Sequence, residues 1–236
     1  MAKFYGKSSS CLVKNDIKYF SFAAGLAVAV LLLVWLVVKS APPAAAGFAA
    51  LALIIFIVIV ADPFILFFKR KSLQFYRGLS GEQDIKKDLE NLPNDFSVYQ
   101  GLEIGDRKGD IDFVVLGPTG IFLLEVKSHK GDIGFNGSQL TLNGRNFTDK
   151  NFFRQVHGET WALKNYLKQQ TGKEFFINSV LVFSSPYAHM HFGYTEVLGI
   201  NIIQKDYLIG LFYRFPKFDY NGSTASLHQA LLRAVS

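Results

Sequence analysis

Three charged side chains lie in segments that are otherwise apolar. Asp112 follows Ile111 at the start of one apolar run, and Glu125 and Lys127 flank Val126 at the end of the next. Two carboxylates held close together repel each other, and a divalent cation with hard oxygen ligands removes that repulsion. A neighbouring lysine can hold a phosphate oxygen or orient the attacking water. The set therefore suits metal-assisted hydrolysis of a phosphodiester.

The pairing of the two apolar runs decides whether these side chains meet. A turn of glycine, proline, threonine and glycine separates the runs, which is typical of a hairpin. With proline and threonine at the centre of the turn, Val114 lies opposite Leu123 and Asp112 lies opposite Glu125. Lys127 shares that face because strand side chains alternate. A slip of one residue would bury charges on both faces, so we predict the unslipped register.

The same three residues also fit a purely structural role. The pattern of an acid, any residue and lysine begins at four positions, Asp16, Asp84, Asp106 and Glu125, and only the last lies inside an apolar strand. A cross-strand ion pair between Lys127 and either carboxylate needs no cation. The residues themselves leave both interpretations open, a metal site and an ion pair.

The elements around these side chains follow from hydrophobic periodicity and turn signals. The predicted elements are a helix at 81–92, strands at 96–104, 111–116 and 121–127, a loose hairpin at 131–147, a helix at 152–170, strands at 177–183 and 198–203, and helices at 205–215 and 226–234. This order indicates an α/β fold with a mixed sheet flanked by helices, because strands and helices do not alternate strictly as in a doubly wound parallel fold.

Other candidate groups for chemistry are weaker. His189 and His191 lie in a predicted short loop without a nearby acidic partner, which does not favour a metal site. Cys11 is the single cysteine, so no disulfide or cysteine-based metal site can form within one chain. The sequence contains no glycine-rich nucleotide loop of the P-loop kind.

The first third of the chain is apolar enough to predict a membrane hairpin. No charged residue falls between Phe20 and Val38, and Asp62 alone interrupts the run at 44–68. A helix needs roughly 20 residues to cross the hydrocarbon core of a bilayer. We predict transmembrane helices at about 19–38 and 44–66, and the lipid bilayer is thus an expected partner.

Domain organisation and charge follow the same division. Residues 1–71 form the predicted N-terminal segment with its two membrane helices, and residues 72–236 form a soluble domain. The first part contains eight Lys and Arg against two Asp and Glu, whereas the second contains 17 of each. The positive-inside rule predicts a two-pass protein of the cell inner membrane with both termini and the soluble domain in the cytoplasm. Balanced charge excludes a broad basic face on the domain, so a nucleic-acid site there must be a local patch.

A series of short motifs runs through the soluble domain from roughly Gly78 to Phe183. In order they are Gly81-Glu82, Ile111-Asp112, Gly117 to Phe122, Glu125-Val126-Lys127-Ser128, Gly131, and Asn151 with Gln155-Val156. Their order and spacing resemble the nuclease-related domain (NERD) family. That family belongs to the restriction-endonuclease-like superfamily of metal-dependent nucleases, so the resemblance implies the mixed sheet of that superfamily.

The resemblance also implies roles for individual residues. Asp112 and Glu125 would be ligands of Mg²⁺ or Mn²⁺, and Lys127 would be the catalytic lysine. Glu82 matches the acidic residue that completes the metal site in such folds. Gln155 matches the polar residue that supports the site from across the sheet.

We therefore expect a membrane-anchored, metal-dependent nuclease that hydrolyses phosphodiester bonds of nucleic acid, with DNA as the expected substrate and RNA as the other possibility. The alternative is a non-catalytic, membrane-tethered module that binds nucleic acid or a protein partner. One position departs from the family. Proline often follows the asparagine at the start of the long helix, where this chain has Phe152. That position is structural.

Overall fold

The chain forms two compact units, one comprising Met1–Ser9 and Arg77–Ser236 and the other Ser10–Tyr76. The computed structural model describes residues 1–6, 76–105, 110–147, 151–191 and 195–235, with scattered positions between 25 and 73. Among these described residues, no helix has the length and apolar character needed to cross a membrane. Apart from the scattered positions, the spans predicted at about 19–38 and 44–66 lie outside the described residues, so the two-helix anchor stays a prediction.

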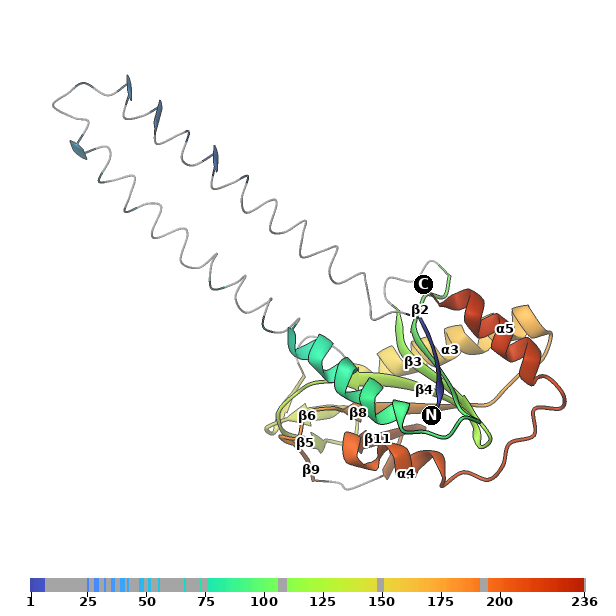
Figure 1. Cartoon of the computed structure of the whole chain (residues 1–236). Helices are drawn as coiled ribbons and strands as arrows, with labels where there is room; N and C mark the ends of the chain where they lie inside the picture. Colours follow the sequence, from blue (N-terminus) through green and yellow to red (C-terminus); the bar gives the residue numbers. More distant parts are fainter. Residues whose placement is uncertain are drawn as a thin grey trace. The chain divides into compact units, whose positions relative to one another are not determined.

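A mixed sheet forms the centre of the larger unit (Figure 1). Within the described residues it has seven strands in the order β1-β2-β3-β4-β8-β11-β10. Their bounds are β1 Lys3–Gly6, β2 Ser97–Leu102, β3 Ile111–Gly117, β4 Gly120–Lys127, β8 Ile177–Phe183, β10 Thr195–Val197 and β11 Ile200–Gln204. Strands β2, β3 and β4 pair antiparallel, whereas β4, β8 and β11 run parallel. The predicted mixed α/β fold is confirmed.

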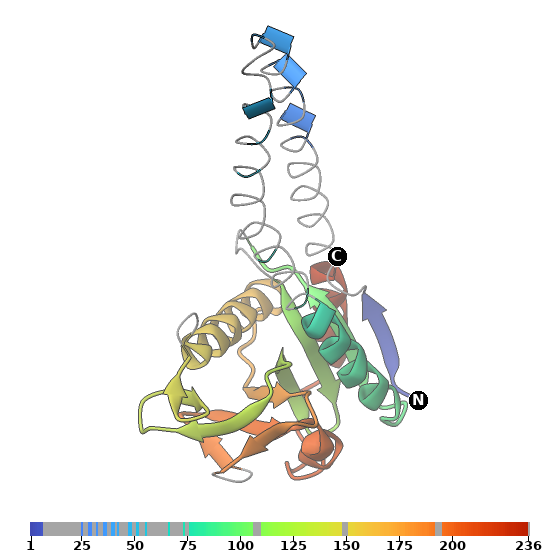
Figure 2. The same ribbon diagram turned by 90° about the vertical axis from the view of Figure 1, so that its left-hand side faces the viewer.

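Helices cover both faces of this sheet (Figures 1 and 2). They are a helix through residues 77–90, α3 Phe152–Thr171, the 3-10 turn η1 Lys205–Tyr207, α4 Leu208–Phe212 and α5 Thr224–Ala234. Val114 and Leu123 are buried on one face with residues of α3 and α5. Phe113 and Phe122 are buried on the other face with residues of the 77–90 helix and α4. Because both faces are covered, a charged side chain on a central strand reaches water only where the strand ends.

A second, smaller sheet continues from two strands of the first. Its order is β7-β6-β5-β9, with β5 Gly131–Phe135, β6 Leu140–Leu142, β7 Arg145–Asn146 and β9 Ala188–Met190. Strand β5 follows β4 along the chain and β9 follows β8, and the two pair again in parallel. Figure 2 shows this sheet beside the N-terminal end of α3. The predicted hairpin at 131–147 is confirmed.

The prediction of a loop at His189–His191 without a nearby acidic partner was wrong, because residues 188–190 form strand β9 and Asp132 lies beside both histidines. His189 lies in β9 opposite Asp132 of β5, and Nε2 of His191 lies 3.3 Å from Oδ1 of Asp132. A three-residue strand is too short for alternation to reveal it. Its partner strand lies more than fifty residues away, so only the tertiary fold supplies the pairing.

Strand β1 is a second difference from the sequence-based division of the chain. Residues Lys3–Gly6 pair in parallel with β2, and the ring of Tyr5 stacks on Tyr99 with 5.2 Å between centroids. From the sequence, residues 3–6 are grouped with the apolar segment that follows them. A fragment that starts at residue 72 would lack β1 and would leave the edge of β2 unpaired, which is a known liability for aggregation.

Candidate functional site

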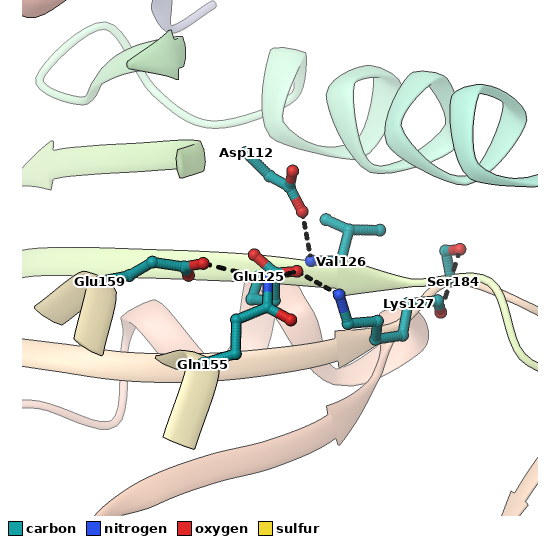
Figure 3. A network of polar contacts seen from close by, with 7 residues as sticks. All are labelled: Asp112, Glu125, Val126, Lys127, Gln155, Glu159 and Ser184. Carbon is teal, nitrogen blue, oxygen red and sulfur yellow. Dashed lines mark hydrogen bonds and ion pairs between the residues drawn. The ribbon is translucent and has the colours of Figure 1, made fainter. Parts of the chain in front are cut away.

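The β3–β4 hairpin has the predicted register. Val114 pairs with Leu123 and Phe113 pairs with Leu124, which confirms that the strands are not slipped. The main-chain pairing of the two strands ends at Phe113 and Leu124, and beyond it a side chain of β3 bonds to the main chain of β4. Oδ2 of Asp112 accepts a hydrogen bond of 2.7 Å from the main-chain N–H of Val126 (Figure 3). Asp112 is thereby fixed against the end of β4.

The alternation of side chains between the two faces of β3 is interrupted at Asp112. Strict alternation would bury Ile111 with Phe113, yet Ile111 belongs to the cluster that contains Val114 on the opposite face. The pairing of β2 with β3 omits Gly101, which lies across from Asp112 and has a positive φ of 67°. Glycine adopts this conformation without the steric cost that other residues meet. The side chains of β3 on the two sides of Asp112, the candidate metal ligand, therefore do not follow one alternating pattern.

Glu125 and Lys127 form a buried ion pair at the end of β4. Nζ of Lys127 contacts Oε1 of Glu125, and the two side chains are 12% and 4% exposed. Burial alone would lower the pKa of the Lys127 ammonium, but the carboxylates of Glu125 and Asp112 outweigh burial and raise that pKa. The ammonium also lies 5.3 Å from the ring centroid of Phe152, a cation–π contact from the start of α3. Lys127 is thus held as a cation.

Gln155 reaches the same carboxylate from α3. Its Nε2 donates to Oε1 of Glu125 at 2.7 Å and to Oε1 of Glu159 at 3.0 Å. The helix is started by Asn151, whose Oδ1 accepts from the main-chain N–H of Arg154 at 3.1 Å. The cap fixes where α3 begins and so places Gln155 one turn later over β4.

Glu159 is a site residue that the sequence analysis missed. It is 5% exposed, and burial together with the charge of Glu125 raises its pKa to about 8. A signal for it existed in the sequence. Glu159 follows Val156 by three residues and precedes Leu163 by four, so it lies on the apolar stripe of the helix, where an acid is unexpected.

Glu82 approaches from the opposite face on the 77–90 helix. It is 8% exposed, and after burial and Glu125 its charge is the next cause of the raised pKa of Asp112. The preceding Gly81 allows this approach. A Cβ at Gly81 would lie 2.4 Å from Oγ of Ser184, closer than side chains can pack. The helix therefore contacts the sheet through a glycine, which brings Glu82 within electrostatic range of Asp112.

All five predicted site residues thus gather around the end of β4 within one segment of the chain. Residues 77–184 match the nuclease-related domain family. The matched segment begins in the helix that carries Glu82 and ends directly after β8, so it also contains Glu159. The mixed sheet with helices on both faces fits the restriction-endonuclease-like superfamily. No curated protein matches the chain.

The donor set in the segment that matches this family is consistent with a hard divalent cation. Among the described residues, no group of three or more His, Cys, Asp and Glu side chains is arranged to hold a metal ion. Mg²⁺ usually keeps several waters and binds one or two carboxylates together with substrate phosphate. Asp112 and Glu125 supply two such carboxylates. Within the described part of the chain, Oε2 of Glu125 is buried without a hydrogen-bond partner, as are Oε1 of Gln155 and Oε2 of Glu159.

Proposed function

We propose that the nuclease-related domain hydrolyses phosphodiester bonds of nucleic acid with Mg²⁺ or Mn²⁺ bound to Asp112 and Glu125. The observation that supports this most is the buried oxygen Oε2 of Glu125, which lacks a hydrogen-bond partner among the described residues and lies beside a second acidic group. Leaving a buried carboxylate oxygen without a partner costs free energy, and a cation would recover it. Such an ion would polarise the phosphoryl group and lower the pKa of a bound water.

Each neighbouring side chain has a task in this proposal. Lys127 stays protonated because the adjacent carboxylates raise its pKa, so it would hold a phosphate oxygen rather than accept a proton. Gln155 orients Glu125 through its 2.7 Å hydrogen bond. Glu82 adds negative charge from the other side of the sheet, which favours a cation near Asp112.

A second candidate function is a non-catalytic module that binds nucleic acid or a protein. The direct contact between Lys127 and Glu125 favours it, because that ion pair partly compensates the buried charge without any cation. The two functions differ in metal binding. An ion pair gains nothing from a cation, whereas the nuclease site requires one.

Membrane anchoring is a further part of the proposal. The large apolar side chains described between residues 28 and 66 are all more than half exposed, which is costly in water and favourable in lipid. They are Val28, Leu32, Trp35, Leu36, Phe48, Leu51, Ile55 and Leu66. We infer a two-pass anchor in the inner membrane with the nuclease-related domain in the cytoplasm. Recovery of the full-length protein in the soluble fraction after cell lysis would contradict the anchor.

The decisive experiment measures cleavage by the full-length protein, because a fragment without β1 would lose an edge strand. Linear, circular and single-stranded DNA and RNA are incubated with Mg²⁺, Mn²⁺ or EDTA. We expect metal-dependent cleavage that disappears in Asp112→Asn and Lys127→Ala. Asp84→Asn is the matched control, since Asp84 lies on the 77–90 helix and its side chain is 42% exposed. Folded protein that neither binds metal by calorimetry nor cleaves would support the binding module instead.

A further inference from the structure

The chain beyond Lys127 carries a second feature that the hydrolytic site does not use. Strands β4 and β8 leave the main sheet together, where the main-chain N–H of Ser184 donates to the carbonyl of Lys127 at 2.9 Å. Four residues after Lys127 and three after Ser184, the N–H of Gly131 donates to the carbonyl of Tyr187 at 2.8 Å. These two hydrogen bonds join the segment that follows β4 to the segment that follows β8. They fix the backbone of both segments, so the side chains there have defined positions.

Lys130 and Tyr187 lie next to each other in this connection. Nζ of Lys130 is 5.0 Å from the ring centroid of Tyr187. Both residues are exposed, and Tyr187 leaves 59% of its surface open. Three residues of chain span at most about 11 Å. The Cα atom of Lys130, in the connection between β4 and β5, therefore lies within that distance of the Cα atom of Lys127.

The place of this pair in the fold points to a substrate contact. In α/β sheets, ligands bind outside the carboxyl ends of parallel strands, and Lys130 and Tyr187 follow the carboxyl ends of β4 and β8. Because residues 72–236 carry balanced charge, local basic and aromatic groups of this kind must supply affinity for nucleic acid.

We propose that Lys130 and Tyr187 form a nucleotide-binding subsite for one unpaired base of a single-stranded or frayed nucleic acid. The base stacks on the tyrosine ring, and the lysine, on its flexible stem, pairs with the adjacent phosphate. The subsite rests on the proposed function, because it holds the strand whose phosphodiester lies at Lys127. A base inside a duplex is already stacked and cannot use the ring, so the subsite selects single-stranded substrate.

The test measures binding of short fluorescent oligonucleotides to the full-length protein in EDTA, so that neither metal nor cleavage contributes. For Tyr187→Ala we expect roughly tenfold or greater weakening with single-stranded DNA or RNA, the effect of losing a base–aromatic stack. Blunt duplex binding should not change, and Tyr187→Phe should bind as the wild type does. Phe176→Ala is the control, because Phe176 is 70% exposed and precedes β8 at the far end of that strand.

The role of Lys130 is tested by the salt dependence of oligonucleotide binding. Lys130→Gln should reduce the slope of log affinity against log salt by about 0.7, the value for one phosphate contact on a single strand. Lys217→Gln should leave the slope unchanged. Lys217 is exposed and precedes Phe218, whose N–H donates to the carbonyl of Pro118 in the β3–β4 turn, so it lies at the other end of β4.

The outcomes separate this inference from the proposed function. Tyr187→Ala protein that binds single strands as tightly as the wild type overturns the subsite, even if the wild type cleaves. Wild-type protein that does not bind single strands at all overturns it too. Binding that depends on Tyr187 but is never followed by metal-dependent cleavage supports the subsite and counts against hydrolysis.

Discussion

The side-chain amide of Gln155 lies 2.7 Å from Oε1 of Glu125, so a helix and a strand that are thirty residues apart in sequence share one hydrogen bond at the site. The same nitrogen reaches Glu159 at 3.0 Å. One donor thereby holds two buried acids in place. The position of Glu125 depends on α3 as well as on its own strand.

Loss of this donor should weaken metal binding more than it weakens the fold. In Gln155→Ala, Glu125 loses a partner that orients it, and removal of such outer partners typically costs about 10–100-fold in metal affinity or activity. We expect calorimetry with Mn²⁺ to show a dissociation constant raised at least tenfold. Gln169→Ala, on the exposed side of the same helix, should match the wild type. Equal affinities in the two variants would show that Gln155 does not position a metal ligand.

Asp112→Asn should separate stability from metal binding. Burial and the charges of Glu125 and Glu82 raise the pKa of Asp112, so the ionised carboxylate is unfavourable without a cation. In EDTA at pH 8 we expect the variant to have a Tm equal to or above that of the wild type. Excess Mn²⁺ should raise the wild-type Tm, because the ion binds the folded state, and should not raise that of the variant.

The control for this measurement is Asp84→Asn, which should respond to Mn²⁺ as the wild type does. A metal-free Asp112→Asn protein that melts well below the wild type would mean that the carboxylate stabilises the fold. That result would support the structural ion pair over the metal site.

The buried acid Glu159 predicts a specific pH dependence of stability. Its pKa is raised to about 8 in the folded protein, mainly by burial and then by Glu125, whereas an unfolded glutamate titrates near its ordinary value of about 4.3. Between these two values the folded state binds more protons than the unfolded state, so stability falls as pH rises through this window. Glu159→Gln removes this loss.

We therefore expect the Tm of Glu159→Gln, relative to the wild type, to increase from pH 5 to pH 8 and to level off above that. The measurement is thermal unfolding in EDTA across this range. Glu196→Gln, at an exposed position of β10, should show no such trend. A constant difference at all pH values would mean that Glu159 titrates normally.

Two glycines of the 77–90 helix should respond in opposite ways to alanine. A Cβ at Gly81 meets Oγ of Ser184 at 2.4 Å and Cβ of Ser128 at 3.2 Å, whereas a Cβ at Gly78 has no neighbour within 4 Å. Overpacking of this kind costs about 1–3 kcal/mol of unfolding free energy. Gly78→Ala should instead stabilise the protein by about 0.5–1 kcal/mol, because alanine favours the helix.

Urea unfolding of both variants gives these free energies. The double variant Gly81→Ala, Ser184→Ala should recover part of the loss, since the contacted hydroxyl is gone. If Gly81→Ala proves neutral, the helix can move away from the sheet, and Glu82 is not fixed near Asp112 by this contact.

Local patterns predicted the pairing of the hairpin that carries three of the candidate site residues. The turn and the two apolar runs determined the register that pairs Val114 with Leu123, because a slip would have buried charge on both faces. The strand at 177–183 was predicted with its observed bounds for a related reason, since a continuous apolar run requires cover on both faces.

Other features depended on contacts between distant parts of the chain. Strands β1 and β9 are too short to show alternation and exist because β2 and β5 offer edges for parallel pairing. The position of Glu159 among the apolar residues of α3 can be read from the sequence. Its contacts with Gln155 and its proximity to Glu125 are known only from the fold.

The sequence by itself determined how the residues of the β3–β4 hairpin pair from the turn to Phe113 and Leu124, because strand alternation and turn geometry act over a few residues. It did not predict that Ile111 lies on the opposite face. The tertiary structure decided what surrounds them. Burial between the helices on the two faces raises the pKa values of Asp112 and Glu159, and the carboxylates of Glu125 and Asp112 raise that of Lys127 against the effect of burial. The close contact at Gly81 brings Glu82 near the site. The desolvation of a side chain and its packing depend on neighbours from distant parts of the chain. A local pattern of residues does not contain this information.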